Sequence, residues 1–308
     1  MNFDYGNLLT RTFQITWKHK VLWAILALPM LVSLAALPFT FVYIFALDGN
    51  PSETAGTILG IGGILFFIIL SIVSTVLYVA SSSAVTLGVI RIERGDGSLN
   101  FIDLLKDGFE YFWRQLGVFL IIQLSIGAVF AVFFACMFAS TMVTMGMASI
   151  CFQPILILLT PLMFLVMGVL EAAYTAVINE DLGSMDAVKR GLSVIREHVW
   201  KYVILTLIIY IGTSIISSIL MLPIFFPIFF FAFGMESNPD LSNQFPLIVG
   251  IFMCIFFPLM IAFSVISQTL MKTSLTLSFL RLTQRTEDQV ISLPENGQGE
   301  NPHVDGII

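Results

Sequence analysis

The sequence carries no charged side chain between Arg114 and Glu171. A water-soluble fold cannot hide so long an apolar stretch, because soluble domains carry roughly 25% charged residues. Here only 11% of the 308 residues are charged and 57% are hydrophobic. Most of this chain must therefore lie in lipid, where the backbone has to satisfy its own hydrogen bonds. We accordingly expect an all-α membrane protein.

Apolar runs of spanning length predict the number of membrane crossings. A hydrocarbon core takes about 20 helical residues. The runs that reach this length are 21–47, 57–90, 116–138, 148–178, 202–233 and 246–280. The break at 139–147 is weak, because only small polar residues such as Ser140 and Thr144 mark it. Hydropathy alone therefore leaves two interpretations open there, a pair of spans or one longer folded-back segment.

The basic residues decide between these two interpretations. All of them fall in the N-terminal segment, in loops 91–115 and 179–201, or near the C-terminal end: Arg11, Lys18, Lys20, Arg91, Arg94, Lys106, Arg114, Lys189, Arg190, Arg196, Lys201, Lys272, Arg281 and Arg285. Loops 48–56, 139–147 and 234–245 contain none. Under the positive-inside rule this pattern predicts six transmembrane helices, with the N-terminus and the C-terminus both cytoplasmic.

The segments before the odd-numbered spans resemble one another. Leu8-Leu9-x3-Phe13-x3-Trp17 aligns with Leu104-Leu105-x3-Phe109-x3-Trp113, and more loosely with Ala187-Val188-x3-Leu192-x3-Arg196. On a helix, each copy has one narrow polar face with apolar residues opposite. This favours a helix lying in the membrane–water interface, with Trp17, Trp113 and Trp200 as interfacial anchors. The alternative is a plain cytoplasmic extension of the next span.

The even-numbered spans repeat a ridge of small residues four positions apart. The copies are Ala80-x3-Ala84-x3-Gly88, Gly168-x3-Ala172-x3-Ala176 and Ser274-x3-Ser278. Such ridges let helix backbones approach closely, so we expect helix packing, with a pore lining as the alternative.

These patterns define the predicted organisation. Residues 1–282 form a single membrane domain of three tandem repeats, at about 1–90, 91–178 and 179–282. Each repeat is an interfacial amphipathic helix followed by a transmembrane hairpin, and all three have the same orientation. The polar residues 283–308 are expected to form a disordered acidic cytoplasmic tail.

The basic-aromatic openings carry a resemblance. Leu9-x3-Phe13-x3-Trp17-Lys18 before a span, and Ala187-Val188-Lys189-Arg190-Gly191-Leu192 ahead of Trp200, resemble uncharacterised prokaryotic polytopic membrane proteins. Those proteins are similar to the membrane domain attached to some glycerophosphoryl diester phosphodiesterases. The resemblance implies a membrane module in a prokaryotic plasma membrane. The phosphodiesterase chemistry does not carry over, since it belongs to a separate barrel with clustered histidines and acids, which this chain lacks.

Few residues suggest chemistry. Glu171 is the one acid inside an apolar run, and Lys272 lies at comparable depth in the last span. We expect them to form a structural ion pair between repeats two and three, with a transport site as the alternative. His19 and His198 occupy equivalent repeat positions. We interpret both as interfacial polar residues, with a role as lipid headgroup ligands as the alternative.

The sequence therefore favours a non-enzymatic membrane module that acts through lipid contact or through helix-mediated binding of other membrane proteins. No catalytic motif, metal-ligand cluster, cofactor fingerprint or nucleic-acid signature occurs in the sequence, so no catalytic, metal or cofactor residues are predicted. The competing hypothesis is a small transporter or exporter with a cavity between repeats near Glu171. It is disfavoured because the central turns of the spans are nearly all apolar.

Overall fold

A computed structural model of the chain describes residues 4–32, 34, 53–95, 99–144, 148–234 and 241–291. Within these ranges the chain is helical and contains no β-strand. The helices are α1 (Tyr5–Lys18), α3 (Glu53–Glu93), α4 (Phe101–Glu110), α5 (Phe112–Val143), α6 (Ala148–Asn179), α7 (Ser184–Glu197), α8 (Val199–Gly234) and α9 (Leu241–Ile291). A further helical stretch, Val21–Val32, follows α1 at an angle of 74°.

Several helices are long and apolar enough to cross a membrane. Among the described residues there are five: Gly60–Glu93, Phe112–Val143, Phe152–Asn179, Val199–Ile219 and Phe256–Thr283. The number rises to six if α1 and Val21–Val32 are taken together as one bent span. The all-helical fold with the helices of a multi-pass membrane protein is thus confirmed.

Some predicted boundaries need correction. Helix α5 continues to Val143, past the predicted end at residue 138, because its Ser and Thr residues hydrogen-bond to carbonyls one turn back and do not interrupt the helix. Helix α9 reaches Ile291, so the predicted tail does not begin at residue 283. Residues 292–308, most of the loop 48–56 and much of the first span 21–47 lie outside the described residues.

The short helices begin at corresponding positions of the three aligned segments. Asp4 caps α1 by accepting a hydrogen bond from the Asn7 backbone N–H at 2.9 Å, as a good N-cap residue does. Asn100 is the N-cap of α4, and Gly183 is the N-cap of α7. When the three segments are aligned on Leu8, Leu104 and Ala187, these caps fall at the same position.

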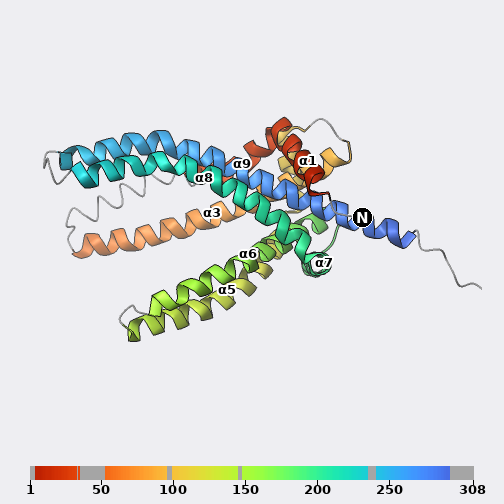
Figure 1. The fold of residues 1–308 in the computed structure, drawn as a ribbon, viewed down its shortest axis with the longest axis horizontal. Coiled ribbons are helices and arrows are strands. Elements are labelled where there is room, and N and C mark those ends of the chain that lie inside the picture. The colour runs from red at the N-terminus through yellow and green to blue at the C-terminus, as the bar shows by residue number, and fades with distance from the viewer. Residues whose placement is uncertain are drawn as a thin grey trace, which may run out of the picture.

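The helices converge at one end of the molecule and diverge at the other. Figure 1 shows the α5–α6 hairpin separating from the α8–α9 hairpin with distance from α1 and α7. We call the convergent end, made of α1, α4, α7 and the C-terminal parts of α3, α6 and α9, the basal end. The core lies there, because most buried hydrophobic side chains of the three long helices fall between residues 79 and 92 of α3, 170 and 178 of α6, and 265 and 282 of α9.

The divergent halves expose large apolar side chains. Ile64 of α3 is 61% exposed, Val129 of α5 is 68% exposed and Ile219 of α8 is 61% exposed. Surface of this kind is unfavourable in water and suits a lipid environment. The buried side chains of the described residues are accordingly concentrated at the basal end.

Two glycines bring short helices into backbone contact with long ones. A Cβ added at Gly108 of α4 would lie 2.7 Å from the Cα of Ala84 in α3. A Cβ added at Gly191 of α7 would lie 2.9 Å from the backbone N of Ala173 in α6. The predicted ridge residue Ala84 of α3 therefore packs against α4, and the ridge residue Gly168 of α6 faces Ile195 of α7, rather than lining a pore along those faces.

Candidate functional site: a buried polar junction of three helices

The ionisable pair singled out in the sequence lies in the basal core. Glu171 belongs to α6 and Lys272 to α9, helices that pack against each other. The Nζ of Lys272 lies 2.5 Å from Oε1 of Glu171, and the two side chains are 4% and 5% exposed, respectively. At this distance the carboxylate and the ammonium form a charge-assisted hydrogen bond away from solvent.

A third helix completes the junction. The Nζ of Lys272 also donates a hydrogen bond to the Ser82 Oγ of α3 at 2.6 Å. It lies 5.4 Å from the ring centroids of both Tyr78 in α3 and Tyr174 in α6. Aromatic faces attract a cation, most strongly where water is excluded. The ammonium group of Lys272 in α9 thus contacts polar and aromatic groups of both α3 and α6, so that one side chain joins three helices.

A second polar contact lies beside the first. The Ser83 Oγ donates to Oε1 of Gln115 at 2.8 Å, and Nε2 of Gln115 donates to the Tyr174 carbonyl at 3.5 Å. Gln115 is fully buried near the start of α5. These bonds connect α3, α5 and α6 in the same region of the core.

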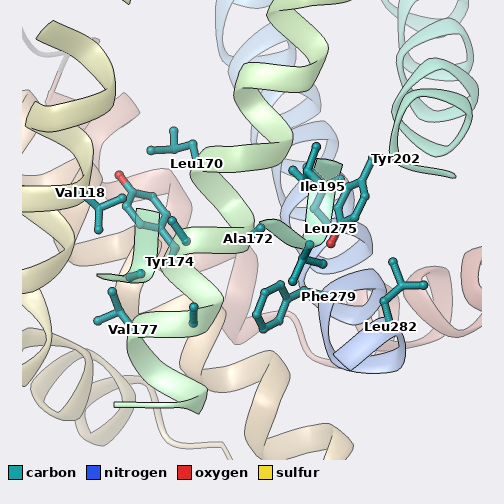
Figure 2. Close-up of a cluster of buried hydrophobic side chains, with 14 of the residues drawn as sticks. Val118, Leu170, Ala172, Tyr174, Val177, Ile195, Tyr202, Leu275, Phe279 and Leu282 are labelled. Carbon is teal, nitrogen blue, oxygen red and sulfur yellow. The ribbon is translucent and has the colours of Figure 1, made fainter. Parts of the chain in front are cut away.

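Hydrophobic side chains enclose the junction. Figure 2 shows Tyr174 of α6 directed toward Val118 of α5, while Ile195, Tyr202 and Leu275 gather on the other side of α6. All five side chains are buried. The ion pair therefore lies next to a packed apolar cluster that joins α5, α6, α7, α8 and α9.

Part of the junction remains unsatisfied. Within the described residues, Glu171 Oε2 and the Tyr174 hydroxyl are buried without a hydrogen-bond partner. A buried polar atom of this kind costs free energy unless it is paired. These two atoms are the feature of the junction that a structural ion pair does not by itself explain.

Surface ion pairs connect the helices of the basal end. Arg11 of α1 lies 3.3 Å from Glu93 of α3, and Arg91 of α3 lies 2.6 Å from Asp107 of α4. Arg190 of α7 lies 3.1 Å from Glu180, which directly follows α6. Each is partly exposed and contributes at most about 1 kcal/mol to stability. The buried pair is a far more constrained contact.

The predicted interfacial anchors lie on the surface. Trp17 is 57% exposed, Trp113 is 75% exposed and Trp200 is 77% exposed. The structure does not bring them together with Glu171 and Lys272. Their position at headgroup depth stays a prediction.

His19 separates α1 from the following helical stretch. Its pKa lies below the usual value, first because of partial burial and then because of the positive charges of Lys18 and Arg11. Partial burial and the two cations therefore favour the uncharged form of the imidazole. No group of three or more His, Cys, Asp or Glu side chains that could hold a metal ion occurs in the part of the chain that the structure describes.

The sequence singled out Glu171 and Lys272 but gave no prediction for Ser82 or Tyr78. Gln115 was expected only as an interfacial polar residue equivalent to His19 and His198, whereas it is fully buried. The run Ser81-Ser82-Ser83 inside an apolar span was the available signal. Hydroxyl groups at that depth need partners, and two of them face Lys272 and Gln115.

No family model, curated protein or solved structure matches the chain significantly. The resemblance to the membrane domain of glycerophosphoryl diester phosphodiesterases stays a prediction.

Proposed function

We propose that this protein is a non-enzymatic, multi-pass membrane module whose hairpins are fastened together at the basal end, and that it acts through the surfaces it offers to lipids and to other membrane proteins. The buried ion pair carries the proposal. Lys272 bonds to Glu171 and Ser82 at once, so its charge is used to join α9 to α6 and α3. A residue held in this way supports the packing of the helices.

The pattern of contacts supports three tandem repeats. Each short helix packs on an even-numbered span of another repeat: α4 on α3, α7 on α6, and α1 on α9. Gly108, Gly191 and Thr12 occupy equivalent positions in the three short helices. Gly108 faces Ala84 and Gly191 faces Ala173, while Thr12 accepts a hydrogen bond from Ser274 at 3.3 Å.

These contacts follow one cyclic rule. The short helix of repeat two packs on repeat one, that of repeat three on repeat two, and that of repeat one on repeat three. Such closure is the expected result for parallel repeats around an axis along the membrane normal. We propose that the basal end faces the cytoplasm, because the basic residues gather there and the positive-inside rule places them on that side. The proposed location is a prokaryotic plasma membrane.

The rival function, a small transporter or exporter, has one observation in its favour. Glu171 Oε2 and the Tyr174 hydroxyl are buried and lack partners within the described chain. A transported ion or polar substrate would supply partners for both. This function requires that water or solute reach the junction from one side of the membrane.

Access of small thiol reagents to Ser82 tests the proposal. Ser82 is fully buried in contact with Lys272. In a background without the three native cysteines, we therefore expect Ser82→Cys to resist a small cationic methanethiosulfonate in membranes permeabilised so that the reagent reaches both sides. Labelling after unfolding in SDS shows that the thiol is reactive. Gly183→Cys, in the open loop before α7, is the matched accessible control on the basal side.

Rapid labelling of Ser82→Cys from either side would show a water-filled path to the junction. That result would favour the transporter and contradict a packed module. Protection of Ser82→Cys together with labelling of Gly183→Cys would support the module.

A further inference from the structure

A hollow of about 640 Å³ lies on the basal surface between α1 and the end of α3. Arg11, Lys18 and His19 line it together with Phe13, Trp17 and Ile92. None of the described residues that line this hollow is acidic. Its volume is within the range of about 300–1,000 Å³ that is typical of small-molecule sites.

The apolar part of this hollow is a set of stacked aromatic rings. Phe13 and Trp17 are parallel, with ring centroids 5.9 Å apart. Trp17 meets Trp23, which lies in the helical stretch after the bend, edge-on at 5.4 Å. Tryptophan rings of this kind favour the level of lipid headgroups and glycerol groups. The hollow therefore combines cations with an aromatic surface at the point where the chain turns from α1 into the bilayer.

A second hollow, of about 660 Å³, provides an internal comparison. It lies along α4, the helix of repeat two that corresponds to α1 of repeat one. The residues that line it are Ile102, Leu105, Lys106, Asp107, Phe109 and Glu110. Its one cation is offset by two acids. The two hollows have similar size and apolar character but opposite charge balance.

We propose that the hollow beside α1 binds the phosphodiester group of an anionic phospholipid, with Arg11 and Lys18 as the cations and the Phe13–Trp17 stack beneath the glycerol and upper acyl chains. This inference rests on the proposed function, since it requires α1 to lie at the membrane interface. It deepens that function by naming the class of lipid and the groups that select it.

Arg11 is available for this role although it has a partner. Its Nε lies 3.3 Å from Oε2 of Glu93, and the two side chains are 42% and 28% exposed. Exposed pairs of this length are weak. A phosphate can therefore share the guanidinium, which has five donors and suits phosphate geometry, with Glu93. Lys18 is in no ion pair among the described residues.

Native mass spectrometry of the detergent-purified protein, titrated with phosphatidylglycerol, tests the site. Each cation near an anionic lipid contributes about fivefold to affinity, so we expect Lys18→Gln to weaken the first binding event about fivefold and Arg11→Gln with Lys18→Gln to weaken it about 25-fold. Lys106→Gln, which removes one cation from the second hollow, is the matched control and should leave the affinity unchanged. Lys18→Arg should keep it.

Two further ligands separate the possible sources of the phosphate. Phosphatidylcholine with the same acyl chains should bind more weakly than phosphatidylglycerol and respond little to the variants. Inorganic phosphate at millimolar concentration should not displace the lipid, because it lacks contact with the aromatic stack. Displacement at equal affinity would overturn the lipid assignment.

An equal loss of affinity in Lys106→Gln and Lys18→Gln would also overturn the proposal, since it would reveal only general attraction to a basic surface. So would wild-type affinity in the double variant. The protection of Ser82→Cys in the same double variant reports on the packed junction separately. Intact protection with unchanged lipid binding would refute this site and leave the proposed module standing.

Discussion

Replacing Gly108 by alanine should loosen the contact between α4 and α3. The added Cβ would lie 2.7 Å from the Cα and 2.8 Å from the backbone N of Ala84, which is fully buried. Non-bonded carbon atoms prefer separations of about 3.5–4.0 Å, so α4 would have to move by about 1 Å. The clashing atoms belong to the backbone of α3 and cannot rotate away.

The size of the effect follows from two opposing terms. Overpacking a well-packed contact costs about 1–3 kcal/mol. Alanine recovers up to about 1 kcal/mol through its higher helix propensity. We therefore expect a net loss of about 1–2 kcal/mol in the free energy of unfolding, and a lower melting temperature in detergent.

Gly127→Ala in α5 is the matched control for this experiment. No heavy atom lies within 4 Å of a Cβ added there, so the variant keeps or slightly raises the melting temperature. Thermal unfolding followed by circular dichroism, at one detergent concentration for all variants, measures both. If Gly108→Ala is as stable as the wild type, or if Gly127→Ala loses as much, the close approach of α4 to α3 is not as described.

Three further predictions concern orientation, depth and pH. In a background without native cysteines, Thr144→Cys should react with an impermeant thiol reagent added from outside, whereas Gly183→Cys should react only after permeabilisation. Labelling of Gly183→Cys from outside would overturn the proposed topology. In a variant that keeps Trp113 as its single tryptophan, shallow lipid-attached quenchers should reduce the fluorescence, whereas quenching by aqueous agents alone would place α4 away from the bilayer. Because the pKa of His19 is lowered in the folded protein, the unfolded chain binds a proton more readily as the pH falls below about 6.5, and the folded state loses stability over that pH range. The melting temperature of His19→Gln should therefore fall less than that of the wild type between neutral and acidic pH. An equal fall would assign the effect to other groups.

Much of the fold could be predicted because it follows from the lipid solvent. Apolar runs between charged loops mark helices, and the structure has long helices over each of the predicted spans 57–90, 116–138, 148–178, 202–233 and 246–280. The ends were less predictable. Ser140 resembles a turn residue in the sequence, yet its hydroxyl bonds to the Cys136 carbonyl one turn back and the helix continues to Val143.

The junction was only partly predictable from the sequence. A lone acid and a lone lysine at comparable depth in apolar helices predicted a pair, because each is costly in lipid without the other. The contribution of α3 could not be derived, since the partner of a serine hydroxyl depends on how the helices are rotated against one another. Ser82 differs little in the sequence from Ser81 and Ser83, and only packing selects it as the partner of Lys272.

The hollow beside α1 also depends on tertiary structure. The amphipathic pattern of residues 8–17 predicted an interfacial helix, but the presence of Ile92 in the same hollow as Trp17 follows from the packing of the helices. The contrast with the hollow along α4 arises from side chains at equivalent positions of two similar segments. Lys18 is replaced there by Arg114, which pairs with Asp181, and Arg11 is replaced by Asp107.

The central claim, that Glu171 and Lys272 hold α6 to α9, is tested most directly by a double-mutant cycle on thermal stability in detergent. Glu171→Gln and Lys272→Met each leave one buried charge without its partner, so each should lower the free energy of unfolding by about 3 kcal/mol or more. The double variant should recover part of that loss, since it leaves neither charge behind. Additive losses would show that the two residues are not coupled and would contradict the account. Unchanged stability of Glu171→Gln, with loss of a ligand-dependent shift in melting temperature, would contradict it in favour of a transport site.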